Sequence, residues 1–191
     1  MILLIKINNH TSKGSMFKED LIDALLGIDE EASLLYGEME FKHRVVIVGG
    51  AAFLLHDLTA RNMTHDIDVL MADEQIRDII SHYPNVNRSV ASYTDQIPYG
   101  FEGRLVLLDL QTKAVEFATP CAEDLVVMKL YADRPADLLD IDGAAEKGLV
   151  DWGLLERLVY DADEAPALAL APRRYREMVD AYERFKARCE G

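Results

Sequence analysis

Apolar residues gather in short dense runs along parts of the chain and at helical spacing along others. Residues 44–48 are almost wholly apolar and β-branched, which is typical of a strand buried on both faces. The next strand is predicted at 66–71, and two more, at 104–110 and 114–118, are joined by a tight connection. A short strand is also expected at 2–7.

Between and after these strands the apolar residues repeat with helical spacing. The pattern predicts helices at 16–26, 32–39, 51–56, 73–80, 120–134, 136–147, 151–159 and 172–188. Asp73 is a suitable N-cap and Gly148 a suitable C-cap. Residues 84–103 have the composition of a loop, and an Ala/Asp/Pro-rich hinge is expected at 161–171. A strand–helix–strand centre followed by helices predicts an α+β fold, a small mixed β-sheet flanked by helices with a C-terminal helical extension.

The length of 191 residues suits a single domain, 1–191, which we divide into N-terminal elements (1–43), a core (44–150) and C-terminal helices (151–191). Half of the residues are hydrophobic, which is enough for a core. The net charge of −14 argues against a protein that coats nucleic acid or binds an anionic membrane. The longest uncharged, weakly polar run, 45–55, is too short to span a bilayer.

Neither a secretory signal nor a cysteine framework is apparent. The first residues lack a cationic lead and a cleavage site, so we expect a cytoplasmic protein with no membrane partner. Cys121 and Cys189 lie in no metal-binding spacing and are expected to be ordinary thiols.

The most informative segment joins a buried strand to two glycines and then to two acidic residues. Gly49 and Gly50 follow the apolar run, where exposed N–H groups at a helix start can hold phosphate. Asp66 and Asp68 come sixteen and eighteen residues after Gly50, and residues i and i+2 of a strand face the same side. Two adjacent carboxylates favour a cation between them, and Mg²⁺ prefers oxygen ligands with substrate phosphates. Together these features predict a nucleoside triphosphate site.

Other interpretations of the same residues exist. Two glycines after a strand also open a dinucleotide-binding domain, but the chain has no GxGxxG and no P-loop lysine. That alternative requires a parallel sheet with a cofactor pocket over Gly49. An isolated Asp-x-Asp is usually a solvated strand edge, so the prediction depends on the combination of glycines and acids.

The pattern Gly-Gly, then Arg61-x-x-Thr64-x-Asp66-x-Asp68, resembles the opening motif of minimal nucleotidyltransferases of the DNA polymerase β-like superfamily. The segment 123–140, EDLVVMKLYADRPADLLD, is similar to the helix pair that follows the catalytic core in the DUF6036 and AbiEii-like groups, which include toxin–antitoxin proteins. The resemblance covers residues 44–150 and implies a nucleotidyltransferase-like core. Taken alone, the second motif is equally consistent with ordinary salt bridges between two helices.

The resemblance assigns roles to individual residues. Asp66 and Asp68 would bind Mg²⁺ and act in catalysis. The residues that would bind the nucleotide are Gly49, Gly50, Thr64, Lys129 and Arg134. A possible second acidic motif is formed by Asp137 and Asp140, which share one helix face.

The superfamily normally has a third carboxylate on a following strand. The candidates are Asp109 and Glu116, of which we expect Asp109, since an acid in an apolar strand must reach a cation or an exposed end. Without a third carboxylate, a family member is expected to bind nucleotide but not to transfer it.

The leading hypothesis is a Mg²⁺-dependent nucleotidyltransferase that transfers a nucleoside monophosphate from a nucleoside triphosphate to a hydroxyl acceptor, with a toxin–antitoxin context. The alternative is a catalytically inactive nucleotide-binding or interaction module on the same fold, such as an antitoxin or sensor. The sequence leaves three points open: the acceptor (tRNA, protein or small molecule), a cognate toxin or antitoxin as a partner, and a homo-oligomer. The last helix is locally basic, so an RNA contact would fall there.

Overall fold

The computed structural model describes residues 14–38, 40–87 and 94–190. Within them, five strands form one mixed sheet in the order β3-β2-β1-β5-β4. The strands are β1 (His43–Val48), β2 (Ile67–Ala72), β3 (Val86–Asn87), β4 (Val106–Leu107) and β5 (Val115–Thr119). The helices are α1 (Lys18–Tyr36), α2 (Gly49–Leu55), α3 (Glu74–Ile80), α4 (Ala122–Ala132), α5 (Pro135–Glu146), α6 (Trp152–Tyr160), α7 (Pro166–Leu170) and α8 (Pro172–Glu190), with a 3₁₀ helix, η2, at Phe101–Arg104. The predicted α+β fold is confirmed.

Strand β1 is the centre of the sheet, as its apolar sequence predicts. It pairs in parallel with β5 and antiparallel with β2, and Val45–Val48 is completely buried. Because β1 and β2 run in opposite directions, the end of β1 lies beside the start of β2, and Val48 is in register with Asp68. The sheet topology therefore brings the two glycines next to the acidic pair. The mixed sheet does not support a dinucleotide-binding domain, which requires a parallel one.

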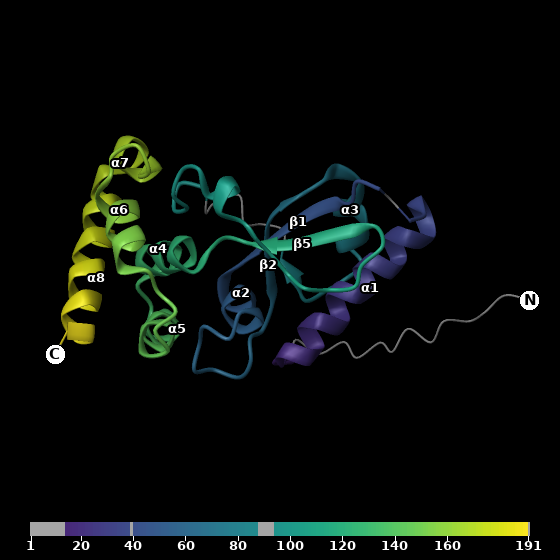
Figure 1. Ribbon diagram of the computed structural model, residues 1–191, viewed down its shortest axis with the longest axis horizontal. Coiled ribbons are helices and arrows are strands. Elements are labelled where there is room, and N and C mark those ends of the chain that lie inside the picture. The colour runs from purple at the N-terminus through teal and green to yellow at the C-terminus, as the bar shows by residue number, and fades with distance from the viewer. Residues whose placement is uncertain (1–13, 39, 88–93, 191) are drawn as a thin grey trace, which may run out of the picture.

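Figure 1 shows two halves of the molecule: a sheet half, with the β-sheet and helices α1 to α3, and a helical half, with helices α5 to α8. Helix α1 contacts both α2 and α3 beside the sheet, whereas α5 to α8 gather at the C-terminal side around α4. Helix α4 contacts α2 as well as α5, α6 and α8, so it joins the halves. No helix in the described ranges is long and apolar enough to cross a bilayer.

Several predicted elements differ from the structure. The two helices expected at 16–26 and 32–39 are one helix, α1. The polar residues near its middle do not end it, because the buried Asp29 carboxylate accepts hydrogen bonds from the backbone N–H groups of Lys113, Ala114 and Val115. This contact ties α1 to the start of β5. The strand expected at 2–7 lies outside the described residues.

The strand predicted at 104–110 is reduced to Val106–Leu107. Arg104 belongs to η2, and beyond β4 the backbone folds back on itself through a bond from Leu110 N–H to the Leu108 carbonyl. The expected loop at 84–103 contains β3 and the start of η2, and the expected hinge contains α7.

The predicted helix ends are only partly confirmed. Asp73 occupies the N-cap position of α3, but its carboxylate contacts His43 and the Arg44 N–H and makes no cap bond. Gly148 has a φ of +67° just beyond α5, as a C-cap glycine requires. Trp152, at the start of α6, is half-buried against Phe185, with ring centroids 5.2 Å apart.

Candidate active site

A cavity of about 350 Å³ lies where β1 ends and β2 begins. Its walls come from α2, the β2 edge, α4 and the start of α5. We call it the glycine-turn cavity. The polar residues and glycines that line it are Gly49, Gly50, Arg61, Thr64, His65, Asp66, Asp68, Asn87, Gln96, Lys129, Arg134 and Asp137. Residues more than eighty positions apart in the sequence therefore share one cavity.

The two glycines allow a close approach between the turn and its neighbours. Gly49 has a φ of +68°, and a Cβ atom there would lie 2.5 Å from Asp68 Oδ2. A Cβ atom on Gly50 would lie 2.9 Å from Thr64 Oγ1 and 3.1 Å from Arg61 Nη2. Both positions therefore require glycine for space, and the first also requires it for its left-handed backbone.

Asp66 and Asp68 both line the cavity but differ in environment. Asp66 directly precedes β2, is exposed, and its carboxylate has no hydrogen-bond or ion-pair partner among the described residues. Asp68 lies within β2, and Asn87 Nδ2 donates to its Oδ1 at 2.8 Å. Burial, followed by the nearby charge of Asp66, raises the pKa of Asp68 above its usual value. The ionised form of Asp68 is therefore disfavoured without a neighbouring cation.

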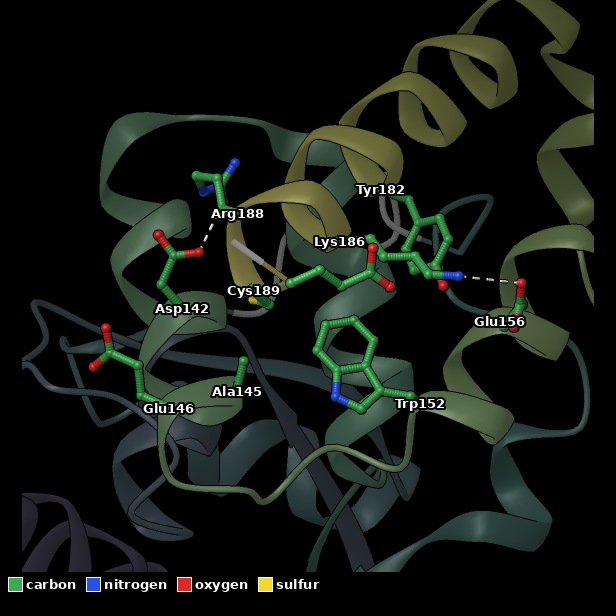
Figure 2. Close-up of a pocket in the computed structure, with 10 residues that line it drawn as sticks. Asp142, Ala145, Glu146, Trp152, Glu156, Tyr182, Lys186, Arg188 and Cys189 are labelled. Carbon is green, nitrogen blue, oxygen red and sulfur yellow. Dashed lines mark hydrogen bonds and ion pairs between the residues drawn. The ribbon is translucent and has the colours of Figure 1, made fainter.

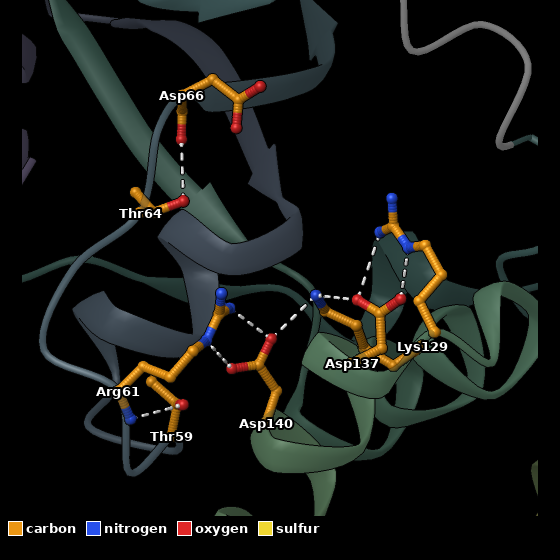
Figure 3. A network of polar contacts seen from close by, with 8 residues as sticks. Thr59, Arg61, Thr64, Asp66, Lys129, Asp137 and Asp140 are labelled. Atoms are coloured by element: carbon orange, nitrogen blue, oxygen red, sulfur yellow. Dashed lines mark hydrogen bonds and ion pairs between the residues drawn. The ribbon is translucent and has the colours of Figure 1, made fainter. Parts of the chain in front are cut away.

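A network of charged side chains crosses the opposite wall (Figure 3). Lys129 Nζ lies 2.6 Å from Asp137 and 2.8 Å from Asp140, and both acids are buried. Arg61 forms a bidentate contact with Asp140, at 2.8 and 2.5 Å. Arg134 binds Asp137 at 2.6 Å. Three cations and two carboxylates leave a formal surplus of one positive charge facing the acidic pair.

The pKa of Asp137 reflects this network. Burial alone would raise it, but hydrogen bonds from Arg134 and Lys129 outweigh that effect and hold the pKa below its usual value. Asp137 is therefore ionised and paired with Lys129, and its carboxylate is already engaged.

The structure brings most of the predicted site residues together. Gly49, Gly50, Thr64, Asp66, Asp68, Lys129 and Arg134 line the glycine-turn cavity, as does Asp137. Asp140 lies behind the lining, where it holds Arg61 and Lys129.

The two candidates for a third carboxylate do not reach the cavity. Asp109 is exposed beyond β4, whose antiparallel pairing carries it away from the glycine turn along β5. Glu116 lies on β5 and binds Arg44 at 2.6 Å. Among the described residues, the acids that line the cavity are Asp66, Asp68 and the paired Asp137.

The sequence prediction gave no role to several residues of the site. Arg61 was part of the quoted pattern, and its spacing before Thr64 was the available signal. Asn87 and Gln96 come from short strand and loop segments that have no periodicity, so no sequence signal marked them. His65, which was not among the predicted site residues, lines the cavity with an exposed imidazole.

The acidic pair fits a divalent cation of the magnesium type. The described residues contain no cluster of three or more His, Cys, Asp or Glu side chains able to hold a metal ion. Mg²⁺ does not need such a cage, because it commonly takes one or two carboxylates and completes its shell with water and substrate phosphates. The unpartnered Asp66 and the raised pKa of Asp68 are consistent with that arrangement.

Comparison with known families identifies the family of this chain. Residues 23–190 match the family model DUF6036, described as a nucleotidyltransferase of unknown function. Comparison with the curated proteins and with the solved structures finds no match.

Proposed function

Because the chain belongs to DUF6036, a nucleotidyltransferase family of unknown function, we propose that it transfers a nucleoside monophosphate from a nucleoside triphosphate to an acceptor hydroxyl. The acceptor oxygen would bond to the α-phosphorus as the bond from that phosphorus to its bridging oxygen breaks, and pyrophosphate would leave. The observation that carries the proposal is the glycine-turn cavity itself. It combines an acidic pair on one wall with a surplus of positive charge on the other.

We assign the metal to Asp66 and Asp68, which would hold Mg²⁺. When bound, this ion would supply positive charge to the triphosphate and to the negative charge that develops during transfer. The family membership and the fit of the acidic pair support this assignment.

Arg61, Lys129 and Arg134 would bind the phosphate oxygens. Arg61 and Lys129 are held by the buried carboxylates of Asp140 and Asp137, so their positions are fixed before substrate arrives. Preorganised charges of this kind need little rearrangement during the reaction. Gly49 leaves room for phosphate oxygens near the backbone because it has no side chain.

Transfer also needs a group that accepts the proton of the attacking hydroxyl. Asp109 and Glu116, the residues considered for that role, lie outside the cavity. His65 lines it, and its imidazole has no hydrogen-bond or ion-pair partner among the described residues. Histidine is the side chain that most often acts as a general base in enzymes, so we assign proton acceptance to His65.

A second candidate function is nucleotide binding without transfer. It is favoured by the position of Asp109, which leaves no unpaired third carboxylate among the described residues that line the cavity. The same fold would then serve as a sensor or an interaction module.

The acceptor is proposed to be a protein or a small molecule in preference to tRNA. Most basic residues of α8 are already engaged with acids: Arg173 with Glu177, Arg174 with Asp95, Arg184 with Asp133, Lys186 with Glu156 and Arg188 with Asp142. Together with the net charge of −14, this leaves little positive surface for a polyanion.

The experiment uses nucleoside triphosphates labelled at the α- or the γ-phosphate, with Mg²⁺ or a chelator. Acceptors are a tRNA pool, the chain itself with added protein, and small hydroxyl compounds. We expect α-label, but not γ-label, in an acceptor, with loss of transfer in Asp66→Asn/Asp68→Asn. The control is Asp142→Asn, an acid outside the cavity.

A binding titration separates the two candidate functions. Nucleotide binding that needs the acidic pair, without transfer to any acceptor, would favour the second candidate. If no triphosphate binds in the presence of Mg²⁺, both candidates are wrong. A toxin role would appear as growth arrest on expression that the double variant relieves.

A further inference from the structure

A second and larger cavity, of about 750 Å³, lies between α5, α6 and α8. We call it the helix cavity; it shares no lining residue with the glycine-turn cavity. Figure 2 shows Asp142 and Glu146 on α5, Trp152 on α6, and Tyr182 and Lys186 on α8 around this space. The proposed nucleotide chemistry uses none of these residues.

The charges around the helix cavity do not balance. Lys186 lies 3.5 Å from Glu156, and Arg188 lies 2.8 Å from Asp142, so both cations are engaged. Two further carboxylates, those of Glu146 and Glu190, also line the cavity, and neither has an ion-pair partner among the described residues. The lining therefore carries a formal surplus of two negative charges.

The helix cavity also contains a buried polar atom without a partner. Tyr182 is 1% exposed, and its hydroxyl has no hydrogen-bond partner among the described residues. Tyr182 lines the cavity, and the Nζ atom of Lys186, another lining residue, lies 6.0 Å from its ring centroid, so this aromatic side chain is part of the cavity wall. A buried hydroxyl without a hydrogen bond costs free energy, which a ligand could recover.

Aromatic rings form the apolar part of the wall. The indole of Trp152 lines the cavity, and Lys186 Nζ already lies 6.0 Å from the Tyr182 ring centroid. Aromatic faces attract cations, and the carboxylates of Glu146 and Glu190 attract them as well. An anion would face Glu146 and Glu190, and a purely apolar molecule would leave the hydroxyl unpaired.

We propose that the helix cavity binds a small organic cation, a primary amine attached to an apolar or aromatic body. The ammonium group would donate hydrogen bonds to Tyr182 Oη and to the Glu146 or Glu190 carboxylate. The apolar body would pack against Trp152. The amine comes either from a free metabolite or from a lysine side chain of a partner.

Trp152 is the only tryptophan of the chain, so its fluorescence reports on this cavity without a label. The full chain is titrated with phenethylamine, with Nα-acetyl-lysine amide, and with 3-phenylpropionate as an anion of matched size. We expect a saturable fluorescence change with an amine, with a dissociation constant of about 0.1 to 1 mM. A response to the blocked lysine alone would assign the site to a partner side chain, and a response to phenethylamine would assign it to a free amine.

The decisive variant is Tyr182→Phe, which removes only the unpaired hydroxyl. We expect amine binding to weaken about tenfold while the melting temperature stays equal or rises, because a buried unsatisfied group is lost. Glu190→Gln should weaken binding several-fold. Glu177→Gln, on the same helix but outside this cavity, should leave binding unchanged.

Three results would overturn the proposal. One is the absence of a saturable change with any amine up to about 10 mM. Another is an equal response to 3-phenylpropionate, which would show that charge plays no part. The third is unchanged amine affinity in Tyr182→Phe.

Discussion

Asp140 is fully buried, and its carboxylate contacts two cations, Arg61 and Lys129. The bond to Arg61 joins the segment before the acidic pair to α5, seventy-nine positions later in the chain. Removing one member of a buried ionic network leaves the others without compensation, which costs far more than a surface pair. Asp140 is therefore expected to be important for both stability and the site.

We predict that Asp140→Asn lowers the free energy of unfolding by about 3 kcal/mol. The amide keeps the shape of the side chain but leaves Arg61 and Lys129 with one negative charge fewer. Urea denaturation followed by circular dichroism measures the change. The control is Asp142→Asn, on the same helix with a partly exposed pair to Arg188, which should cost less than about 1 kcal/mol. Equal losses in both variants would contradict the assignment.

His56 is predicted to make the protein less stable in mild acid. The Thr119 hydroxyl donates to the Pro120 carbonyl, so it accepts from His56 Nε2–H. Burial and the charge of Lys18 lower the pKa of His56 below 6.5, against a smaller effect of Asp57. As the pH falls below about 6.5, the His56 imidazole therefore binds a proton in the unfolded chain before it does so in the folded protein. This difference favours unfolding until the pH reaches the folded-state pKa of His56.

Between about pH 7 and about pH 5, the wild type should lose more free energy of unfolding than His56→Gln. The glutamine variant cannot titrate in this range but can still donate to Thr119. Denaturant titrations at a series of pH values test this, and parallel curves for the two proteins would count against it.

The turn that joins β1 to α2 depends on Gly49 for two reasons, its φ of +68° and the Asp68 oxygen only 2.5 Å from an added Cβ atom. We predict that Gly49→Ala displaces Asp68 and abolishes Mg²⁺-dependent nucleotide binding. Isothermal titration with a nonhydrolysable triphosphate measures the loss.

Gly148→Ala is the matched control, since Gly148 has a φ of +67° and no atom lies within 4 Å of its added Cβ. It should cost about 1 kcal/mol of stability from backbone strain and leave nucleotide binding intact. If Gly49→Ala behaves like this control, the close approach to Asp68 is not required.

The contiguous parts of the site could be predicted from the sequence. Gly49, Asp66 and Asp68 belong to one strand–helix–strand segment, so local spacing was sufficient to place them together. Asn87 lies on the two-residue strand β3 and Gln96 in a turn, and their positions beside the cavity depend on tertiary contacts that local patterns do not encode. Asp109 does not line the cavity because β4 runs antiparallel to β5 and carries the chain away from the glycine turn, and apolar composition does not specify that direction.

The same distinction applies to the fold. The apolar run of β1 predicted its central, buried position, and helical spacing predicted α4, α5 and α8. The pairing of β1 with β5 joins segments about seventy residues apart, and no local pattern specifies that neighbour. The continuity of α1 through Asp29 also depends on a distant partner, the backbone at Lys113–Val115.

At the scale of the whole molecule, the single-domain organisation is still a prediction. Helix α4 contacts α2 in the sheet half and α8 in the helical half, so the halves should unfold together. Trp152 fluorescence reports on the helical half, and hydrogen exchange of the Val45–Val48 amides reports on the sheet. We expect both to give the same free energy of unfolding, whereas two separate values would indicate two domains.

Helix α5 presents Asp137 to the glycine-turn cavity and Asp142 to the helix cavity. Occupants of the two cavities would therefore act on one rigid element. If an amine in one cavity shifts α5 and changes the affinity for nucleotide in the other, nucleotide must change the affinity for amine by the same factor. Thermodynamic reciprocity of this kind would let the concentration of one compound set the fraction of the protein that holds the other.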